Sequence, residues 1–368
     1  MSFVPGLELS RAFFVDCVAP LVDQLAPGLR YGAALLGEGS EVLGYDTPIS
    51  TDHDWGPRVQ LFVAKEDFER AAFAIVTSPG ALLPSHFKGH PVGFPPSRVR
   101  PTGVDARAGA AGSPAHGIEV HDLWSWAERQ LGVAIRPGVP LSAIDWLSIP
   151  EQSLLSLTAG AVFRDDRGEL AKLRDRLSWF PRDVWLYKLG CQWARVSEEI
   201  AFVGRCGDVG DEIGSRIVAA RLVHDAMHIA LLMECRYAPY SKWRGRAFSE
   251  LAAAPRLTPA IEQMFAAPDW RSRERSLSDV LLSLAQLHLE RRLPGEIKPA
   301  VSPYYDRPYH VINAQAIAIA IFAAIKGPAV RELPKVGGVD QFCDNTALLA
   351  HPRQAVAAAR AVLMGGGG

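Results

Sequence analysis

The sequence has few cysteines, and they do not occur in pairs. There are five among 368 residues, and none lies in a CxxC arrangement. An odd, scattered set of this kind excludes a disulfide framework and a zinc site built on paired cysteines. We therefore expect reduced thiols. The five residues are Cys17, Cys191, Cys206, Cys235 and Cys343.

The sequence also lacks a long hydrophobic run. The longest, Ala314 to Ile325, is well short of the roughly 20 residues that span a bilayer. The N-terminus has no basic patch followed by an apolar segment, and Glu8 and Arg11 fall where a signal peptide needs apolar residues. These absences predict a cytoplasmic protein that does not interact with a membrane.

There is almost no net charge. The formal charge is −1, so the whole chain has no electrostatic attraction to nucleic acid or to an anionic surface. Its 48% hydrophobic and 21% charged residues are ordinary for a globular protein. The length is enough for about two domains.

The stretch from Tyr31 to Val63 carries the most informative pattern. An apolar run ends in a turn that contains Gly39 and Ser40, and a second β-like run ends the stretch. Between them, Thr51 precedes an Asp-x-Asp pair, Asp52 and Asp54. On a strand the side chains at i and i+2 point the same way, so this pattern predicts both carboxylates on one face.

Such a pair of carboxylates is typical of a divalent-cation site. Two anionic groups a few ångströms apart repel unless a cation lies between them, and hard oxygen ligands suit Mg²⁺ or Mn²⁺. The flexible turn at Gly39 and Ser40 lets backbone N–H groups approach a phosphate closely. The stretch therefore predicts a combined phosphate and metal site.

The same pattern resembles the nucleotidyltransferases of the DNA polymerase beta superfamily. They have Gly-Ser after a first strand and Asp-x-Asp on the next strand, and Gly39, Ser40, Thr51, Asp52 and Asp54 match in order and spacing. The motif Asp-His-Asp-Trp-Gly at residues 52–56 looks like that of an uncharacterised branch of this superfamily, usually labelled only as a domain of unknown function. The resemblance implies Mg²⁺ or Mn²⁺ as cofactor and a nucleoside triphosphate, such as ATP, as donor.

The superfamily places a third carboxylate on a later strand beside the Asp pair. A strand is predicted over residues 117–121, with Ile118 and Val120 on one face and Glu119 and His121 on the other. Glu119 is the candidate that completes the metal site or acts as general base. Asp122 is the reserve candidate, and a role as helix cap is equally open for it.

The composition changes near residue 140. Strand signals end there, and helical periodicity dominates from residue 141 onward. The prediction is an α+β protein with a small mixed-sheet catalytic domain (1–140), a helical substrate- and nucleotide-binding domain (141–364) and a flexible tail (365–368). This division resembles small-molecule members of the superfamily such as kanamycin nucleotidyltransferase.

Two clusters of aromatic and charged residues in the helical part are further candidates. In related transferases a basic side chain from the helical domain contacts the triphosphate, so Lys242 is a candidate for phosphate binding. Tyr240 is a candidate for contact with the nucleobase or the substrate. A helix-end cation among core aromatics is an equal alternative. A second cluster, residues 304–310, could line an acceptor pocket or simply pack between helices.

His224 and His228 stand at i and i+4, the spacing of the zinc motif His-Glu-x-x-His. An Asp replaces the Glu, and no third ligand is evident in the flanking sequence. We expect a helix surface or interface here. The Gly- and Pro-rich segment 78–96 predicts an irregular loop, in which His86, Lys88 and His90 could contact an anion.

The expected function is transfer of a nucleoside monophosphate from a nucleoside triphosphate to a hydroxyl of a small molecule or protein side chain. The neutral charge disfavours a polynucleotide acceptor. An alternative is a catalytically inactive nucleotide-binding regulatory protein of the same fold. The early Gly56-Pro57 and the missing arginine before Gly44 keep that alternative open. The sequence makes no prediction of oligomeric state.

Overall fold

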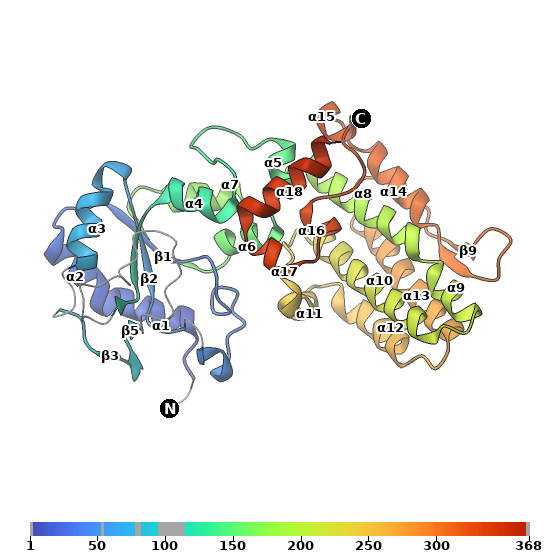
Figure 1. The fold of residues 1–368 in the computed structure, drawn as a ribbon, viewed down its shortest axis with the longest axis horizontal. Helices are drawn as coiled ribbons and strands as arrows, with labels where there is room; N and C mark the ends of the chain where they lie inside the picture. Colours follow the sequence, from blue (N-terminus) through green and yellow to red (C-terminus); the bar gives the residue numbers. More distant parts are fainter. Residues whose placement is uncertain (1–2, 53–54, 78–81, 95–114, 366–368) are drawn as a thin grey trace. The chain divides into compact units, whose positions relative to one another are not determined.

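The computed structural model describes residues 3–52, 55–77, 82–94 and 115–365 (Figure 1). A mixed four-stranded sheet with flanking helices is followed by a largely helical body. The architecture is therefore α+β, and this prediction is confirmed.

The chain divides into two compact units. One, which we call the sheet unit, consists of Met1–Val139 and Ser153–Ser178. The other, the helical unit, consists of Pro140–Gln152 and Trp179–Gly368. The chain passes from one unit to the other three times, because residues 153–178 return to the sheet unit.

The sheet unit is built on a mixed sheet with the strand order β7-β2-β1-β8. β1 pairs antiparallel with both β2 and β8, whereas β2 pairs parallel with β7. The predicted strands around residues 31, 59 and 118 are all present. The strand bounds are β1 (Tyr31–Leu35), β2 (Val59–Val63), β7 (Ile118–Asp122) and β8 (Ala161–Asp165).

One face of this sheet carries the main hydrophobic core of the unit. Leu61, Ile118 and Val120 are fully buried there, together with Phe13 and Ile75 from the covering helices. Residues 6–25 form one helical run, in line with the helical spacing of their apolar residues from Leu7 to Leu25, and its central turn is π-helical. The elements on this face are α1 (Gly6–Phe13), the π-helix (Phe14–Val18), α2 (Ala19–Leu25) and α3 (Phe68–Thr77).

The other face of the sheet packs against α4 (Leu123–Leu131). Trp126 of this helix makes edge-on ring contact with Phe62 of β2, at a centroid distance of 5.1 Å. His121 of β7 lies beside both rings. The predicted alternation in β7 is confirmed, since Ile118 and Val120 face the core and His121 faces α4.

Strands also occur where the sequence predicted none. β8 lies beyond residue 141 and completes the sheet, although its residues are only half-buried and its pattern does not alternate clearly. Short strands also interrupt the segment expected to be irregular, because Lys88 and Gly89, both with positive φ, close a tight hairpin. Residues 97–104, whose alternating sequence pattern also predicts a strand, lie outside the described residues. The short strands are β3 (His86–Phe87), β4 (His90–Pro91), β5 (Gly93–Phe94), β6 (Ala115–His116), β9 (Val301–Pro303) and β10 (His310–Ile312).

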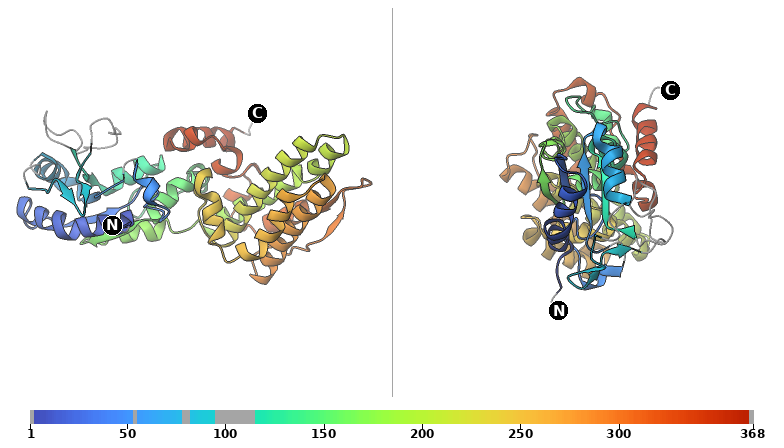
Figure 2. Two further views of the ribbon diagram at one scale, coloured as in Figure 1. Left: turned by 90° about the horizontal axis from the view of Figure 1, so that it is seen from below. Right: turned by 90° about the vertical axis from the view of Figure 1, so that its left-hand side faces the viewer.

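The helical unit is organised around its longest helices. α10 packs against both α8 and α13, while α14 packs against α8 and α12 against α13 (Figure 2). All five were predicted from periodicity. Their bounds are α8 (Arg182–Glu199), α10 (Glu212–Met233), α12 (Ala254–Ala266), α13 (Trp270–Glu290) and α14 (Ala314–Ala323).

Shorter helices complete the chain. Residues 141–159 have the helical periodicity of one continuous helix but form two, α5 and α6, because Pro150 separates them and lacks the N–H that a continuous helix needs. The bounds are α5 (Ala143–Ser148), α6 (Glu151–Thr158), α7 (Glu169–Arg176), α9 (Phe202–Asp208), α11 (Ser241–Ser249), α15 (Pro328–Arg331), α16 (Val339–Phe342), α17 (Thr346–Leu349) and α18 (Pro352–Met364). Among the described residues, none of the helices combines the length and apolar character needed to cross a membrane.

Candidate functional site

The strand directions bring three segments that carry or adjoin candidate residues to the same end of the sheet. β1 ends where the antiparallel β2 begins, since Ala34 is opposite Gln60. β7 is parallel to β2, so it begins at the same end, with Glu119 beside Gln60. The loop after β1, the segment that leads into β2 and the first residues of β7 therefore lie at this end of the sheet.

The loop after β1 is held by hydrogen bonds at its base. The Gly37 N–H donates to the Ser156 carbonyl of α6 at 2.8 Å, and the Leu36 N–H donates to Gln60 Oε1 at 2.9 Å. Gly39 has a φ of +138°, and a Cβ at this position would lie 2.6 Å from a carboxylate oxygen of Glu41. Only glycine satisfies both the backbone angle and this close approach.

Glu41 and Arg58 form a buried ion pair beside this loop. Their side chains are 5% and 13% exposed, and the Arg58 guanidinium also donates to the Glu38 carbonyl. Arg58 Nε is buried without an acceptor in the described part of the chain. Neither residue was predicted from the sequence, in which the arginine usual before Gly44 is missing. A guanidinium is present here, and it comes from the segment before β2.

Asp52 does not lie on a strand. It is the last residue of a 3-10 helix, Pro48–Asp52, and β2 begins only at Val59. The expectation that Asp52 belongs to a strand is therefore wrong. Thr47 and Ser50 explain the turn, because the Thr47 N–H donates to Ser50 Oγ and Ser50 N–H donates to the Thr47 carbonyl. Asp54, the second residue of the pair, lies outside the described residues.

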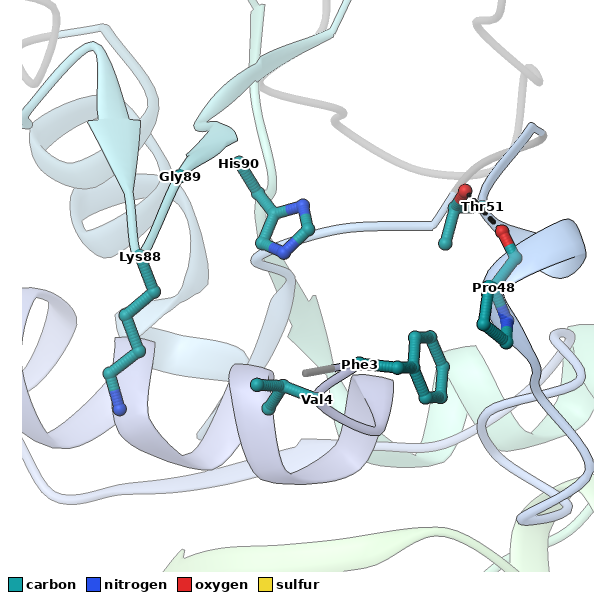
Figure 3. Close-up of a pocket in the computed structure, with 7 residues that line it drawn as sticks. All are labelled: Phe3, Val4, Pro48, Thr51, Lys88, Gly89 and His90. Carbon is teal, nitrogen blue, oxygen red and sulfur yellow. Dashed lines mark hydrogen bonds between the residues drawn. The ribbon is translucent and has the colours of Figure 1, made fainter. Parts of the chain in front are cut away.

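Thr51 is exposed, and its hydroxyl donates to the Pro48 carbonyl at 2.9 Å. It lines a pocket of about 340 Å³ that also has Phe3, Lys88 and His90 in its wall (Figure 3). Of the predicted nucleotide- and metal-binding residues that the structure describes, Thr51 lines this pocket, and so do Lys88 and His90, the loop residues proposed as anion contacts. The Gly39–Ser40 loop and Glu119 do not.

Glu119 lies one residue into β7 and is 20% exposed. Its Oε2 is 2.9 Å from Nε2 of the buried His121, which shares its face of the strand. Asp122 has a different role, because it caps α4 by accepting a hydrogen bond from the Ser125 N–H at 2.8 Å. Among the described residues, no three His, Cys, Asp or Glu side chains converge in a way that could hold a metal ion.

The candidates in the helical unit are on and before α11. Tyr240 precedes the helix, is partly exposed, and its N–H donates to Gln152 Oε1 at 3.0 Å. Lys242 is exposed, and its Nζ lies 4.9 Å from the centre of the Trp243 ring. Both side chains are accessible to a ligand.

The remaining candidates separate into exposed and buried residues. His224 is exposed, whereas His228 is buried and its Nε2 lies 2.9 Å from Glu151 Oε1. The interpretation of this pair as a helix surface and interface agrees with these positions. In the second aromatic cluster, Tyr305 is exposed, while Tyr309 is buried and its hydroxyl contacts Asp208.

Comparison with known proteins gives two findings. Residues 146–244 match a family model described as a domain of unknown function, DUF4037. A solved structure, that of a nucleotidyltransferase-like protein from Exiguobacterium sibiricum 255-15, is similar at 10% identity and a TM-score of 0.31. The similarity covers 83% of this chain and 97% of that one. No curated protein matches.

The family match confirms one part of the predicted resemblance, namely the domain of unknown function. The matched residues begin in α5 and end in α11, so they lie outside the Gly39–Ser40 loop and the Asp52–Asp54 pair. Membership of the DNA polymerase beta superfamily stays a prediction. The chain is similar to proteins with a DUF4037 domain over residues 146–244.

Proposed function

We propose that the protein is a metal-dependent nucleotidyltransferase. It would transfer a nucleoside monophosphate from a nucleoside triphosphate to a hydroxyl group and release pyrophosphate. The observation that supports this proposal is that the end of β1, which leads into the Gly37–Ser40 loop, the start of β2, which follows the segment containing Asp52, and the start of β7 with Glu119 lie at the same end of the sheet.

The loop would bind the β- and γ-phosphates. Gly39 and Ser40 would contribute backbone N–H groups and the serine hydroxyl, which are suitable donors for phosphate oxygens. The buried Nε of Arg58 supports this role, because it adds a charged donor beside the loop that has no acceptor among the described residues.

The carboxylates would provide the metal site and the base. Asp52 and Asp54 would hold Mg²⁺ or Mn²⁺, and the bound ion would neutralise charge on the triphosphate. Glu119 would accept the proton of the attacking hydroxyl, as a new O–P bond forms and the bond to pyrophosphate breaks. His121, 2.9 Å from Glu119, would hold that carboxylate in place.

The helical unit would complete nucleotide binding and select the acceptor. Lys242 and Tyr240 have accessible side chains, which suits contact with a phosphate and with a base or substrate. Because the chain has a net charge of −1, we propose a small molecule or a protein side chain as the acceptor.

The test is calorimetric titration of the protein with ATP, GTP, CTP and UTP, with and without Mg²⁺. Binding that requires Mg²⁺ and is lost in the Asp52→Asn/Asp54→Asn double variant is the expected result. The same titration identifies the donor nucleotide. If no nucleotide binds, the proposed function is wrong.

A second candidate is a nucleotide-binding regulatory protein without turnover. It is favoured by two departures from the superfamily pattern, the Gly56-Pro57 that follows Asp54 early and the missing arginine before Gly44. Pyrophosphate release from a bound nucleoside triphosphate separates the two candidates. Binding with no release, across a panel of hydroxyl acceptors, would favour the regulatory protein.

A further inference from the structure

The interior of the helical unit contains a cluster of charged side chains that the proposed function does not use. Glu151 at the start of α6 and Lys188 of α8 have no exposed side-chain surface, and Lys188 Nζ lies 2.9 Å from Glu151 Oε1. The same oxygen is 2.9 Å from His228 of α10, and Glu151 Oε2 accepts the Ala238 N–H at 2.7 Å. Both carboxylate oxygens of Glu151 are therefore occupied.

Asp340 of α16 extends this cluster. Its two oxygens accept the Glu151 N–H at 3.0 and 3.1 Å, and Oδ2 lies 3.9 Å from Lys188 Nζ. The neighbouring Gly338 leaves room for the lysine, because a Cβ there would lie 2.7 Å from Lys188 Nζ. The backbone is thus adapted to hold a cation in this interior position.

Arg244 of α11 is the unusual member. Its Nε and Nη1 atoms are buried, and neither has an acceptor among the described residues. The carboxylates of Glu151, Asp340 and Asp225 are close enough to act on its charge. None of them makes a hydrogen bond with it in the described structure, and Asp225 is instead bonded to Gln192 and Arg195.

Two buried guanidinium donors without an acceptor are costly, since each loses its bonds to water and gains nothing in return. Burial accordingly lowers the pKa of Arg244, against the effect of the nearby carboxylates. A native structure satisfies such donors with a ligand or with ordered water. Arg244 is only partly buried as a whole residue, so its side chain lies at the boundary between the interior of the unit and its surface.

We infer that Arg244, which shares the carboxylates of Glu151 and Asp340 with Lys188, forms a binding site for a compact oxyanion, a phosphate or carboxylate group, within the helical unit. The planar guanidinium offers adjacent N–H donors in the geometry that such groups accept. Lys188 adds one positive charge, which offsets part of the negative charge of Glu151 and Asp340. The site lies in the helical unit alone and does not depend on the proposed transfer reaction.

Titration calorimetry on the full chain tests this inference, with inorganic phosphate, pyrophosphate and citrate as separate probes and no divalent cation. Comparing phosphate with citrate distinguishes a phosphate-specific site from a general carboxylate site. Arg244→Gln is expected to weaken binding at least tenfold. Arg246→Gln is the matched control, because it removes the same charge from the same helix at an exposed position paired with Glu250.

The comparison of the two variants also separates this site from the proposed nucleotide site. Both variants keep the Gly39–Ser40 loop, so a loss of binding in Arg244→Gln alone assigns the probe to the helical unit. If Arg244→Gln does not fold, Arg244→Lys keeps the charge, removes the planar pair of donors and is expected to show the same loss. Equal binding by the Arg244 and Arg246 variants, or no binding of any probe at millimolar concentration, would show that water satisfies these donors and would overturn the inference.

Discussion

Lys188 and Glu151 form an ion pair with no exposed surface on either side chain, and their charged atoms are 2.9 Å apart. Both residues fall within the stretch that matches the family model. Removing two charges from water costs several kcal/mol per ion, and the pair is stable only because further partners share the charge. His228, Ala238 and Asp340 provide those partners.

Glu151→Gln should strongly destabilise the protein. The change leaves the Lys188 ammonium buried without its nearest counter-charge, an arrangement that typically costs about 3–5 kcal/mol. Urea unfolding followed by circular dichroism measures the loss. Adding Lys188→Met to the variant should recover part of it, since an apolar side chain then replaces the unpaired charge. A double variant as unstable as the sum of the two single variants would mean that the ion pair is not coupled.

Gly338→Ala and Gly245→Ala should have opposite effects. A Cβ at Gly338 meets Lys188 Nζ at 2.7 Å, so overpacking should cost about 1–3 kcal/mol. A Cβ at Gly245 meets nothing within 4 Å, and in the interior of α11 alanine is favoured over glycine by about 0.5–1 kcal/mol. Melting temperatures of the two variants provide the comparison. Equal shifts would show that Lys188 moves away without cost.

Asp340→Asn should change how stability depends on pH. Burial raises the pKa of Asp340 from its ordinary 3.8 to about 6, with Lys188 opposing and Glu151 assisting. Between these two pH values the folded protein binds more protons than the unfolded chain, so this carboxyl group makes the native protein less stable as pH rises from about 4 to 6. The variant lacks this effect. The wild type should therefore lose roughly 1–3 kcal/mol relative to Asp340→Asn across that range.

The measurement is urea unfolding of both proteins at several pH values from 4 to 7. Asp344→Asn is the control, because this neighbouring carboxylate is exposed. A stability difference between wild type and Asp340→Asn that stays constant with pH would mean that Asp340 titrates normally.

Glu119 and Asp122 should respond differently to substitution. Asp122→Ala removes the N-cap of α4 and should lower the free energy of unfolding by about 1 kcal/mol, while Asp122→Asn should retain most of it. Under the proposed function, Glu119→Gln should lower turnover by two orders of magnitude or more with little loss of stability. Paired activity and unfolding assays test this. Full activity in Glu119→Gln would remove Glu119 from the mechanism.

Lys242→Ala should weaken nucleoside triphosphate binding without destabilising the fold. The ammonium is exposed over Trp243, and a surface cation of this kind contributes only about 0.5–1 kcal/mol to stability. Calorimetric affinity and melting temperature can be measured on the same sample. An unchanged nucleotide affinity would return Lys242 to the alternative of a structural cation at a helix end.

The elements that could be predicted from sequence are those with a strong local pattern. The long helices such as α10 and α13 have clear periodicity, and β7 alternates between core and α4 because Ile118 and Val120 must be buried. β8 could not be predicted, because its half-buried residues do not alternate and its pairing with β1 joins residues far apart in the sequence. Periodicity does not report such long-range pairing.

The candidate site was only partly predictable for the same reason. Gly39 was identified from its pattern, and its positive φ gives the physical basis. Asp52 was placed on a strand because Asp-x-Asp precedes a β-like run, but the Thr47–Ser50 hydrogen bonds favour a 3-10 helix. Glu41 and Arg58 are 17 residues apart in the sequence, so no local pattern shows that they pair. No sequence pattern marks Arg244 either. A buried donor without an acceptor is visible only in three dimensions.

The three crossings between the two units affect how the protein can be divided. A fragment that ends near residue 140 would lack β8, and the backbone N–H and C=O groups of β1 that pair with β8 would then form a free sheet edge. Free edges of this kind promote association between chains. Helix α6 would be divided too, since Glu151 and Gln152 belong to the helical unit and the residues from Ser153 onward to the sheet unit. Neither unit can therefore be obtained intact by a single cut in the chain.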